Sequence, residues 1–145
     1  MKLLLQRVLS ASVDIEGERV GEIGPGLMVL CGVEAHDDEQ LMQKAIDKLL
    51  AYRVFSDEQG KMNLSLNDTG GGLLLVSQFT LAANTRKGLR PSFSSAATPD
   101  QAKELYEKAL SYAVSKIDNV QAGRFAADMQ VSLVNDGPVT FLLEF

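Results

Sequence analysis

The chain has 145 residues, of which 46% are hydrophobic and 23% charged, and its formal net charge at pH 7 is -5. This length fits a single domain over residues 1–145 whose core needs no disulfide or metal, and the composition excludes disordered and fibrous proteins. The negative net charge argues against binding of duplex nucleic acid over a broad surface. It is compatible with the binding of one RNA end by a local basic patch.

The first half of the chain predicts three strands and a helix. Residues 3–15 and 19–23 alternate apolar and polar side chains on either side of Gly17, which predicts an antiparallel hairpin. Residues 27–33 form a continuous apolar run, typical of a strand buried on both faces. Asp37, with Gln40 three residues later, resembles a helix start, and the apolar positions that follow recur at helical spacing: Leu41, Met42, Ala45, Ile46, Leu49 and Leu50.

The second half alternates loops with regular elements. Residues 55–72 are polar and contain glycine, which indicates a hairpin or loop, residues 73–79 form an apolar strand, and residues 82–97 form a long loop. Thr98 and Pro99 predict the start of a second helix, because proline at the first helical position loses no needed hydrogen bond. Its buried stripe is expected at Leu105, Ala109, Leu110, Ala113 and Ile117.

The C-terminal part predicts a last pair of strand segments. Alternation through Met129, Val131 and Leu133 breaks at residues 135–138 and resumes over residues 139–145. Together the elements predict a mixed α/β fold whose mostly antiparallel strands form two layers, with two helices packed on one side.

No apolar stretch approaches the roughly 20 residues of a membrane helix, and the N-terminus turns polar after three leucines, unlike a signal peptide. The single cysteine, Cys31, lies in the apolar run over residues 27–31, where a small buried thiol is expected. We therefore expect a cytoplasmic protein with no membrane partner.

Elimination narrows the chemistry, because the chain has one histidine and one cysteine. Zinc sites need several such ligands, and a metal held only by carboxylates, which the composition still allows, has no calcium-loop or two-histidine helix motif to support it. We therefore expect neither metal nor cofactor. Gly70–Gly72 precede three leucines and lack the lysine of a phosphate loop, which favours a flexible strand entry. A serine or threonine nucleophile would need a base, and only His36 could serve, although its place before a helix is also that of an ordinary surface residue.

Two polar segments stand out against this background. Ser77-Gln78-Phe79-Thr80 ends an apolar strand, where functional sites commonly form, although a strand leaving the core looks the same. Asn-Asp-Gly-Pro-Val-Thr over residues 135–140 contains an Asp-Gly pair typical of a hairpin turn. Pro138 cannot donate a ladder hydrogen bond, so a special turn with a cis Gly137–Pro138 bond is the alternative.

A third polar segment is basic. Arg86, Lys87 and Arg90 lie within five residues of each other in the predicted loop. Such a cluster is either a solvated loop or a local patch for one RNA end.

The two motifs, in this order and in a chain of this length, resemble the paired signatures of the D-aminoacyl-tRNA deacylase family. The resemblance covers the whole chain and includes Leu-Gln-Arg-Val within residues 4–8, the third strand and Arg-Lys-Gly-Leu-Arg-Pro-Ser-Phe over residues 86–93. It implies a homodimeric editing enzyme that hydrolyses the ester between tRNA and a D-amino acid, so that the tRNA acceptor end is its other partner.

The resemblance also implies roles for individual residues. Gly137 and Pro138, in cis, would project into the partner's active site, accept hydrogen bonds from the substrate amino group and leave no room for an L side chain. A gate that works by collision should pass achiral glycine. Ser77 and Gln78 would contact the ester, with the N–H of Gln78 or Phe79 as oxyanion donor, and the residues near the adenosine would be Phe79, Arg7, Phe125 and Met129.

Thr80 is the tempting nucleophile, but nothing in the sequence supplies its base, which favours a supporting role. The ribose 2′-hydroxyl beside the ester, or a water that it orients, would then assist hydrolysis. Two rival hypotheses stay open: a non-catalytic dimeric RNA- or protein-binding module, and a serine or threonine esterase that uses Thr80 on small metabolites.

Overall fold

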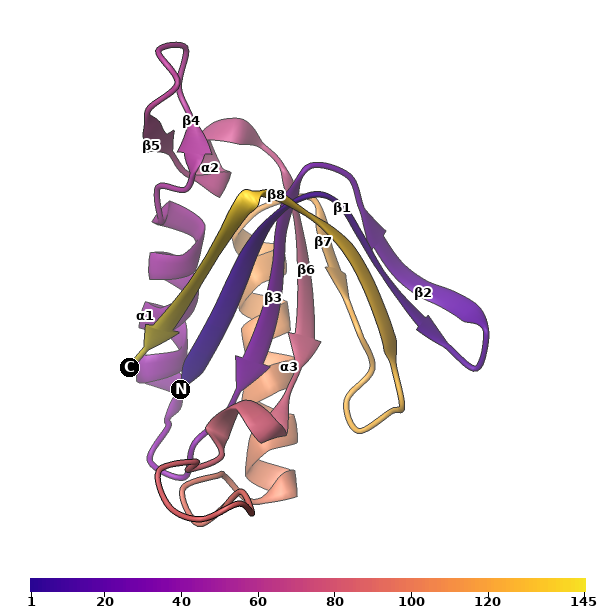
Figure 1. Cartoon of the computed structure of the whole chain (residues 1–145), viewed down its shortest axis with the longest axis vertical. Coiled ribbons are helices and arrows are strands. Elements are labelled where there is room, and N and C mark those ends of the chain that lie inside the picture. The colour runs from indigo at the N-terminus through magenta and orange to yellow at the C-terminus, as the bar shows by residue number, and fades with distance from the viewer.

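A computed structural model describes residues 1–145 and consists of one six-stranded sheet, a small two-stranded sheet and two long helices (Figure 1). The strands are β1 (Lys2–Ile15), β2 (Glu18–Ile23), β3 (Gly26–Gly32), β4 (Phe55–Ser56), β5 (Met62–Leu64), β6 (Gly72–Ser77), β7 (Val120–Ala122) and β8 (Gln130–Glu144). The helices are α1 (Glu39–Ala51), α2 (Leu66–Thr69) and α3 (Pro99–Lys116), with a 3₁₀ helix, η1 (Phe79–Ala82).

The main sheet has the order β2-β1-β3-β6-β7, and β8 pairs with β1 along most of its length. All its pairings are antiparallel except β3 with β6 and β6 with β7, which are parallel. This arrangement confirms the predicted class, a mixed α/β fold with mostly antiparallel strands and two helices on one side (Figure 1).

The apolar runs of β3 and β6 are buried on both faces, as their continuous hydrophobicity predicts. Leu27 and Leu73 belong to the larger core cluster, under α1 and α3, whereas the adjacent Met28 and Leu74 belong to a smaller cluster. The smaller cluster lies on the other face, where the second half of β1 and Ile23 of β2 cover it. The strands thus form two layers because β1 is long enough to contribute to both.

The start of α1 differs from the prediction by one residue. The cap is Asp38, whose side chain accepts a hydrogen bond from the Leu41 N–H at 2.7 Å, and not Asp37. Asp37 is instead buried and binds the N-terminal ammonium of Met1. Either aspartate satisfies the local capping pattern, so a contact distant in sequence decided between them. The second helix begins as predicted, with Thr98 as the cap and Pro99 first.

The segment predicted as a hairpin or loop contains both the β4–β5 hairpin and a short helix, α2, which the prediction missed. Ser65 and Asp68 form a reciprocal capping box at its start, and Gly70 ends it in the left-handed region with φ of 65°. The spacing of Ser65 and Asp68 is that of a helix start. The prediction missed it because the third helical position usually carries glutamate or glutamine and here carries aspartate.

The predicted break at residues 135–138 is a bulge inside the single strand β8. Thr140 lies opposite Gln6 and Asn135 lies opposite Val8, so residues 136–139 face only Arg7. β8 pairs with β1 alone, which agrees with the confinement of proline to sheet edges and bulges. No helix in the structure has the length and apolar character needed to cross a membrane.

Candidate active site

The end of β6 opens into a mostly apolar cavity of about 540 Å³. Its walls come from four parts of the chain: the strand end, the last residues before and the first residues of α3, the β7–β8 connection and the start of β8. The lining residues are Val76, Ser77, Gln78, Phe79, Ala97, Pro99, Ala102, Phe125, Ala126, Ala127, Met129 and Val131. A largely apolar cavity with a few convergent polar groups is the usual form of a small-ligand site.

The predicted residues Ser77, Gln78 and Phe79 all line this cavity, and Thr80 lies just outside it. The Gln78 N–H donates to the carbonyl of Cys31 at 2.8 Å and is therefore already occupied. The Phe79 N–H opens η1, where the first amides have no partner inside the helix. Of the two amides expected to polarise a carbonyl, only that of Phe79 is available.

Thr80 has one side-chain partner, the Gln78 amide, which donates to its hydroxyl at 2.5 Å. An amide cannot take a proton from a hydroxyl, and His36 contacts the Phe145 carbonyl and Asp37 instead. The geometry therefore gives Thr80 no general base.

The far wall of the cavity is braced by Tyr106, an inward-facing residue of α3. Its buried hydroxyl donates to the Leu75 carbonyl at 2.9 Å, and its ring packs against Phe125 with centroids 6.1 Å apart. Gly123 lies so close to Met129 that an added Cβ would be 2.5 Å from the Met129 sulfur. The predicted pair Phe125 and Met129 thus lines the same cavity as the Ser-Gln-Phe motif. Tyr106 and Gly123, which contact this pair, were not predicted from the sequence as functional residues.

The second motif forms a clamped protrusion on β8. The Gly137–Pro138 peptide bond is cis, both residues are exposed, and Gly137 has φ of 127°. Asn135 spans the bulge, because its Oδ1 accepts from the Val139 N–H at 2.9 Å and its Nδ2 donates to the Thr140 hydroxyl at 2.8 Å. The sequence predicted Asn135 only as part of a turn, so its hydrogen bonds across the bulge could not be predicted.

Arg7 belongs to this protrusion and not to the cavity of its own chain. Its guanidinium donates to the carbonyls of Asp136, at 3.1 Å, and Val54, at 2.6 Å, and forms an ion pair with the Asp136 carboxylate at 3.3 Å. The structure therefore brings Arg7 together with Gly137, and it does not bring Arg7 together with Phe125 and Met129 within one chain.

The two motifs lie at different levels of the sheet, since Ser77 ends β6 whereas the bulge lies midway along β8. Ser77 is level with Cys31 of β3, whereas the bulge is level with Arg7, which pairs with Leu27. Strand rise and strand spacing place Gly137 roughly 19 Å from Ser77 across three strand spacings. One chain therefore cannot present both motifs to the same small molecule.

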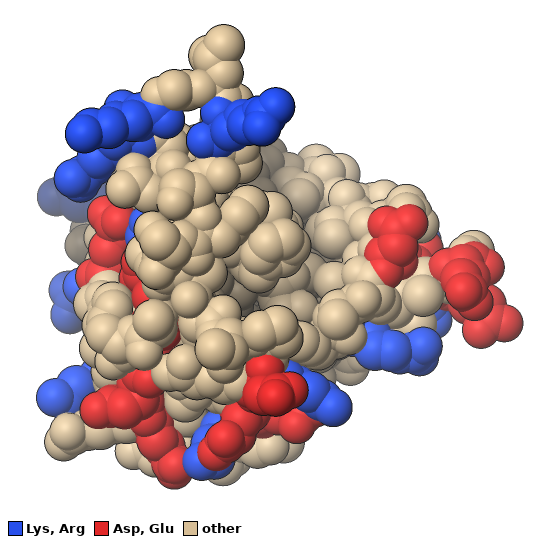
Figure 2. All heavy atoms as spheres, turned by 90° about the horizontal axis from the view of Figure 1, so that it is seen from below, with Lys and Arg blue, Asp and Glu red and all other residues tan.

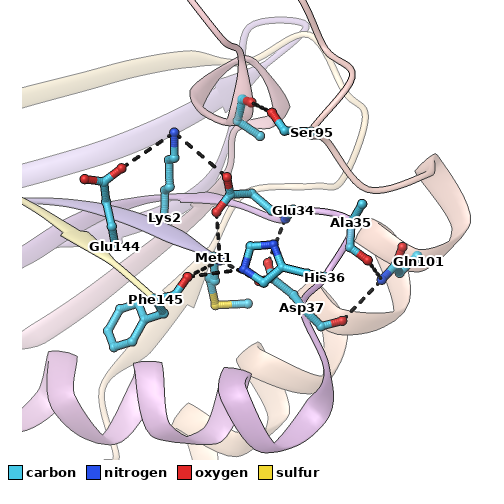
Figure 3. A network of polar contacts seen from close by, with 11 residues as sticks. Met1, Lys2, Glu34, Ala35, His36, Asp37, Ser95, Gln101, Glu144 and Phe145 are labelled. Carbon is cyan, nitrogen blue, oxygen red and sulfur yellow. Dashed lines mark hydrogen bonds and ion pairs between the residues drawn. The ribbon is translucent and has the colours of Figure 1, made fainter.

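The one group of side chains with metal-ligand geometry is Glu34, His36 and Asp37, whose ligand atoms lie within 4.8 Å of one another (Figure 3). The Met1 ammonium already binds both carboxylates, at 3.0 Å to Glu34 and 2.5 Å to Asp37. These contacts account for the cluster as a structural ion-pair network.

The sequence of the chain is similar to known proteins over nearly its whole length. Residues 4–144 match the family model described as D-Tyr-tRNA(Tyr) deacylase. The chain is 59% identical to the D-aminoacyl-tRNA deacylase of Shewanella loihica and 63% identical to that of Stutzerimonas stutzeri, in each case over 144 residues and 99% of both chains.

Solved structures agree on the fold. A protein described as c-Myc DNA Unwinding Element Binding Protein superposes with a TM-score of 0.96 at 39% identity, over 100% of this chain and 99% of the other. A probable eukaryotic D-amino acid tRNA deacylase superposes with a TM-score of 0.85 at 17% identity, over 98% and 97% of the two chains.

Proposed function

The chain belongs to the D-Tyr-tRNA(Tyr) deacylase family, and from this premise we propose how its residues remove D-amino acids from tRNA. It is an enzyme, a D-aminoacyl-tRNA deacylase, which hydrolyses the ester between the amino acid and the tRNA. The observation that carries the proposal is the cavity at the end of β6, where the Ser-Gln-Phe motif faces Phe125 and Met129 across an apolar space. The terminal adenosine occupies this cavity, with its ester at Ser77 and Gln78.

The Phe79 N–H is the oxyanion donor in this scheme. A backbone donor aimed at the position where negative charge develops on the ester carbonyl stabilises the tetrahedral intermediate, and its fixed direction avoids reorganisation during the reaction. The free amide at the start of η1 supports this assignment, since the neighbouring Gln78 N–H is bonded to Cys31.

Hydrolysis then needs a group that activates water, and the protein offers none beside Thr80. The ribose 2′-hydroxyl is adjacent to the ester in the substrate itself, so it assists the attack, either directly or through a water that it orients. Thr80 supports the site by holding the Gln78 side chain.

The enzyme acts as a homodimer in this proposal, with β8 at the interface. Large apolar side chains are exposed along β1 and β8, notably Leu9, Val134, Phe141 and Leu142 at 54%, 52%, 37% and 48%. β8 also has one unpaired edge. Because Gly137 and Ser77 are too far apart within one chain, a second copy is needed for the Gly137–Pro138 protrusion to reach a substrate.

The protrusion acts as a stereochemical gate. Its main-chain carbonyls accept hydrogen bonds from the substrate α-amino group, and its backbone occupies the volume into which an L side chain would point. Arg7 and Asn135 keep the protrusion rigid, which steric exclusion requires. Glycine has no side chain to collide, so glycyl-tRNA is a second substrate.

The test is a hydrolysis assay with D-tyrosyl-, L-tyrosyl-, glycyl- and L-alanyl-tRNA, the last two on the same tRNA. Wild type should hydrolyse the D- and glycyl esters and spare the L-esters. Equal rejection of glycine and L-alanine would contradict the steric gate, and no hydrolysis of any ester by folded protein would favour the non-catalytic module.

Gly137→Ala probes the gate directly, because the new Cβ would meet the Val139 Cγ2 at 2.8 Å and the Arg7 Nη2 at 3.0 Å. The displaced protrusion should lose discrimination between D- and L-esters. Gly60→Ala is the matched control: Gly60 also has positive φ, at 76°, but open space around it. A Gly137→Ala enzyme that rejects L-esters as wild type does would overturn the gate.

A further inference from the structure

The loop between η1 and α3 contains a cationic surface that the reaction scheme does not use. Arg86, Lys87 and Arg90 are all exposed and make no ion pair. From Thr69 to Pro99 the chain contains no Asp or Glu, although its net charge is -5. An acidic protein thus concentrates three uncompensated positive charges in one loop.

The end of the molecule that carries this loop has one edge rich in Lys and Arg (Figure 2). Figure 2 looks onto the end of the molecule that carries the loop and shows a group of Lys and Arg along one edge, whereas the opposite edge and the projection at the side carry Asp and Glu interspersed with Lys and Arg. Uncharged surface lies between them. A polyanion approaching this end would therefore meet positive charge without nearby acidic compensation only at the loop.

The loop is held in place and is joined to the cavity. Asn84 and Ser92 exchange two backbone hydrogen bonds, of 2.7 and 3.1 Å, which close the tip that carries the three cations. The Phe93 ring packs on the Phe79 ring with centroids 5.1 Å apart, and Phe79 lines the cavity. The loop that carries the cations therefore adjoins the cavity through the contact of Phe93 with Phe79.

The joining rings are themselves exposed, Phe79 by 62% and Phe93 by 38%. Exposed aromatic faces beside a line of cations are the chemistry that binds single-stranded nucleic acid, because bases stack on the rings and phosphates contact the cations. Duplex binding would require cations spread over a broader surface than one loop tip.

We propose that this loop, residues 84–93, binds the single-stranded nucleotides that precede the terminal adenosine of the substrate RNA. Their phosphates contact Arg86, Lys87 and Arg90, and a base stacks on the exposed face of Phe93. The proposal rests on the proposed function, since it takes the cavity to hold the terminal adenosine. The loop then captures tRNA without taking part in hydrolysis.

The test compares two substrates, D-tyrosyl-tRNA and 3′-O-D-tyrosyl-adenosine, which lacks the preceding phosphates. Replacing all three cations by glutamine should lower kcat/KM on the tRNA by roughly ten- to fifty-fold at 0.15 M salt and reduce its logarithmic salt slope by about 2, since each phosphate contact contributes about 0.7. Activity on the adenosine ester should not change. Phe93→Leu should lower kcat/KM on the tRNA alone by about tenfold.

The matched control removes the same charge elsewhere: Lys44→Gln, Lys48→Gln and Lys116→Gln, on exposed positions of α1 and α3. Equal kcat/KM on tRNA for the loop variant and this control would overturn the proposal, as would an equal loss on both substrates.

A binding measurement separates this proposal from the proposed function. If wild type hydrolysed neither substrate, the proposed function would fail, and anisotropy of a fluorescent single-stranded RNA would still test the loop. The loop variant should then bind this RNA at least tenfold more weakly than the control does. Unchanged RNA binding, or equally tight loop-dependent binding of a DNA duplex, would refute the proposal.

Discussion

Replacing Asp37 by asparagine should destabilise the protein by about 3 kcal/mol. The Asp37 side chain is fully buried and binds the equally buried Met1 ammonium at 2.5 Å, while its second oxygen accepts from the Glu34 N–H at 2.7 Å (Figure 3). Removing one partner of such a pair leaves an uncompensated buried charge, which typically costs about 3–5 kcal/mol. The Glu34 carboxylate, 3.0 Å from the ammonium, remains, so the lower end of that range applies.

The assays are urea denaturation, which gives the free energy of unfolding, and thermal denaturation, which gives Tm, both monitored by circular dichroism. A loss of about 3 kcal/mol corresponds to a fall in Tm of roughly 6–12 °C for a domain of this size. Asp38→Asn is the control, because asparagine caps helices as well as aspartate does and Asp38 is exposed. A loss below about 1 kcal/mol for Asp37→Asn, or an equal loss for both variants, would refute this electrostatic reasoning.

Three further predictions concern the site and the core. Thr80→Ala should keep measurable deacylase activity, whereas a substrate with a 2′-deoxy terminal adenosine should be hydrolysed far more slowly; an inactive but correctly folded Thr80→Ala would instead indicate covalent catalysis. Gly123→Ala should push Met129 into the cavity and raise KM several-fold with little loss of stability, because the clash at 2.5 Å is with a flexible side chain; Gly24→Ala, in open space, is its control, and an unchanged KM would contradict the cavity assignment. Burial, followed by the charge of Asp37, raises the pKa of Cys31 to about 12, so the native thiol stays protonated at pH 8 and iodoacetamide should label it only as urea unfolds the protein; rapid labelling of the native state would show that the thiol is accessible.

The identity of the site could be predicted in part from local sequence. Ser77, Gln78 and Phe79 line one cavity together with Phe125 and Met129, and their roles toward the substrate stay predictions. The choice of the Phe79 amide over that of Gln78 could not be predicted, because it depends on the parallel pairing of β6 with β3, which occupies the Gln78 N–H. The ion pair of Arg7 with Asp136 could not be predicted either, because it joins residues from opposite ends of the chain.

By itself, the sequence determined the elements whose signals are local. Thr98 and Pro99 start α3 because capping and the fixed φ of proline act within one turn, and the apolar runs of β3 and β6 specify strands buried on both faces. Tertiary structure alone decided that Asp38 and not Asp37 caps α1, that residues 135–138 bulge from one continuous strand, and that Gly137 lies far from Ser77. Each of these outcomes depends on contacts with residues more than 30 positions away in the sequence. The pattern within one segment does not specify which distant residues that segment will contact.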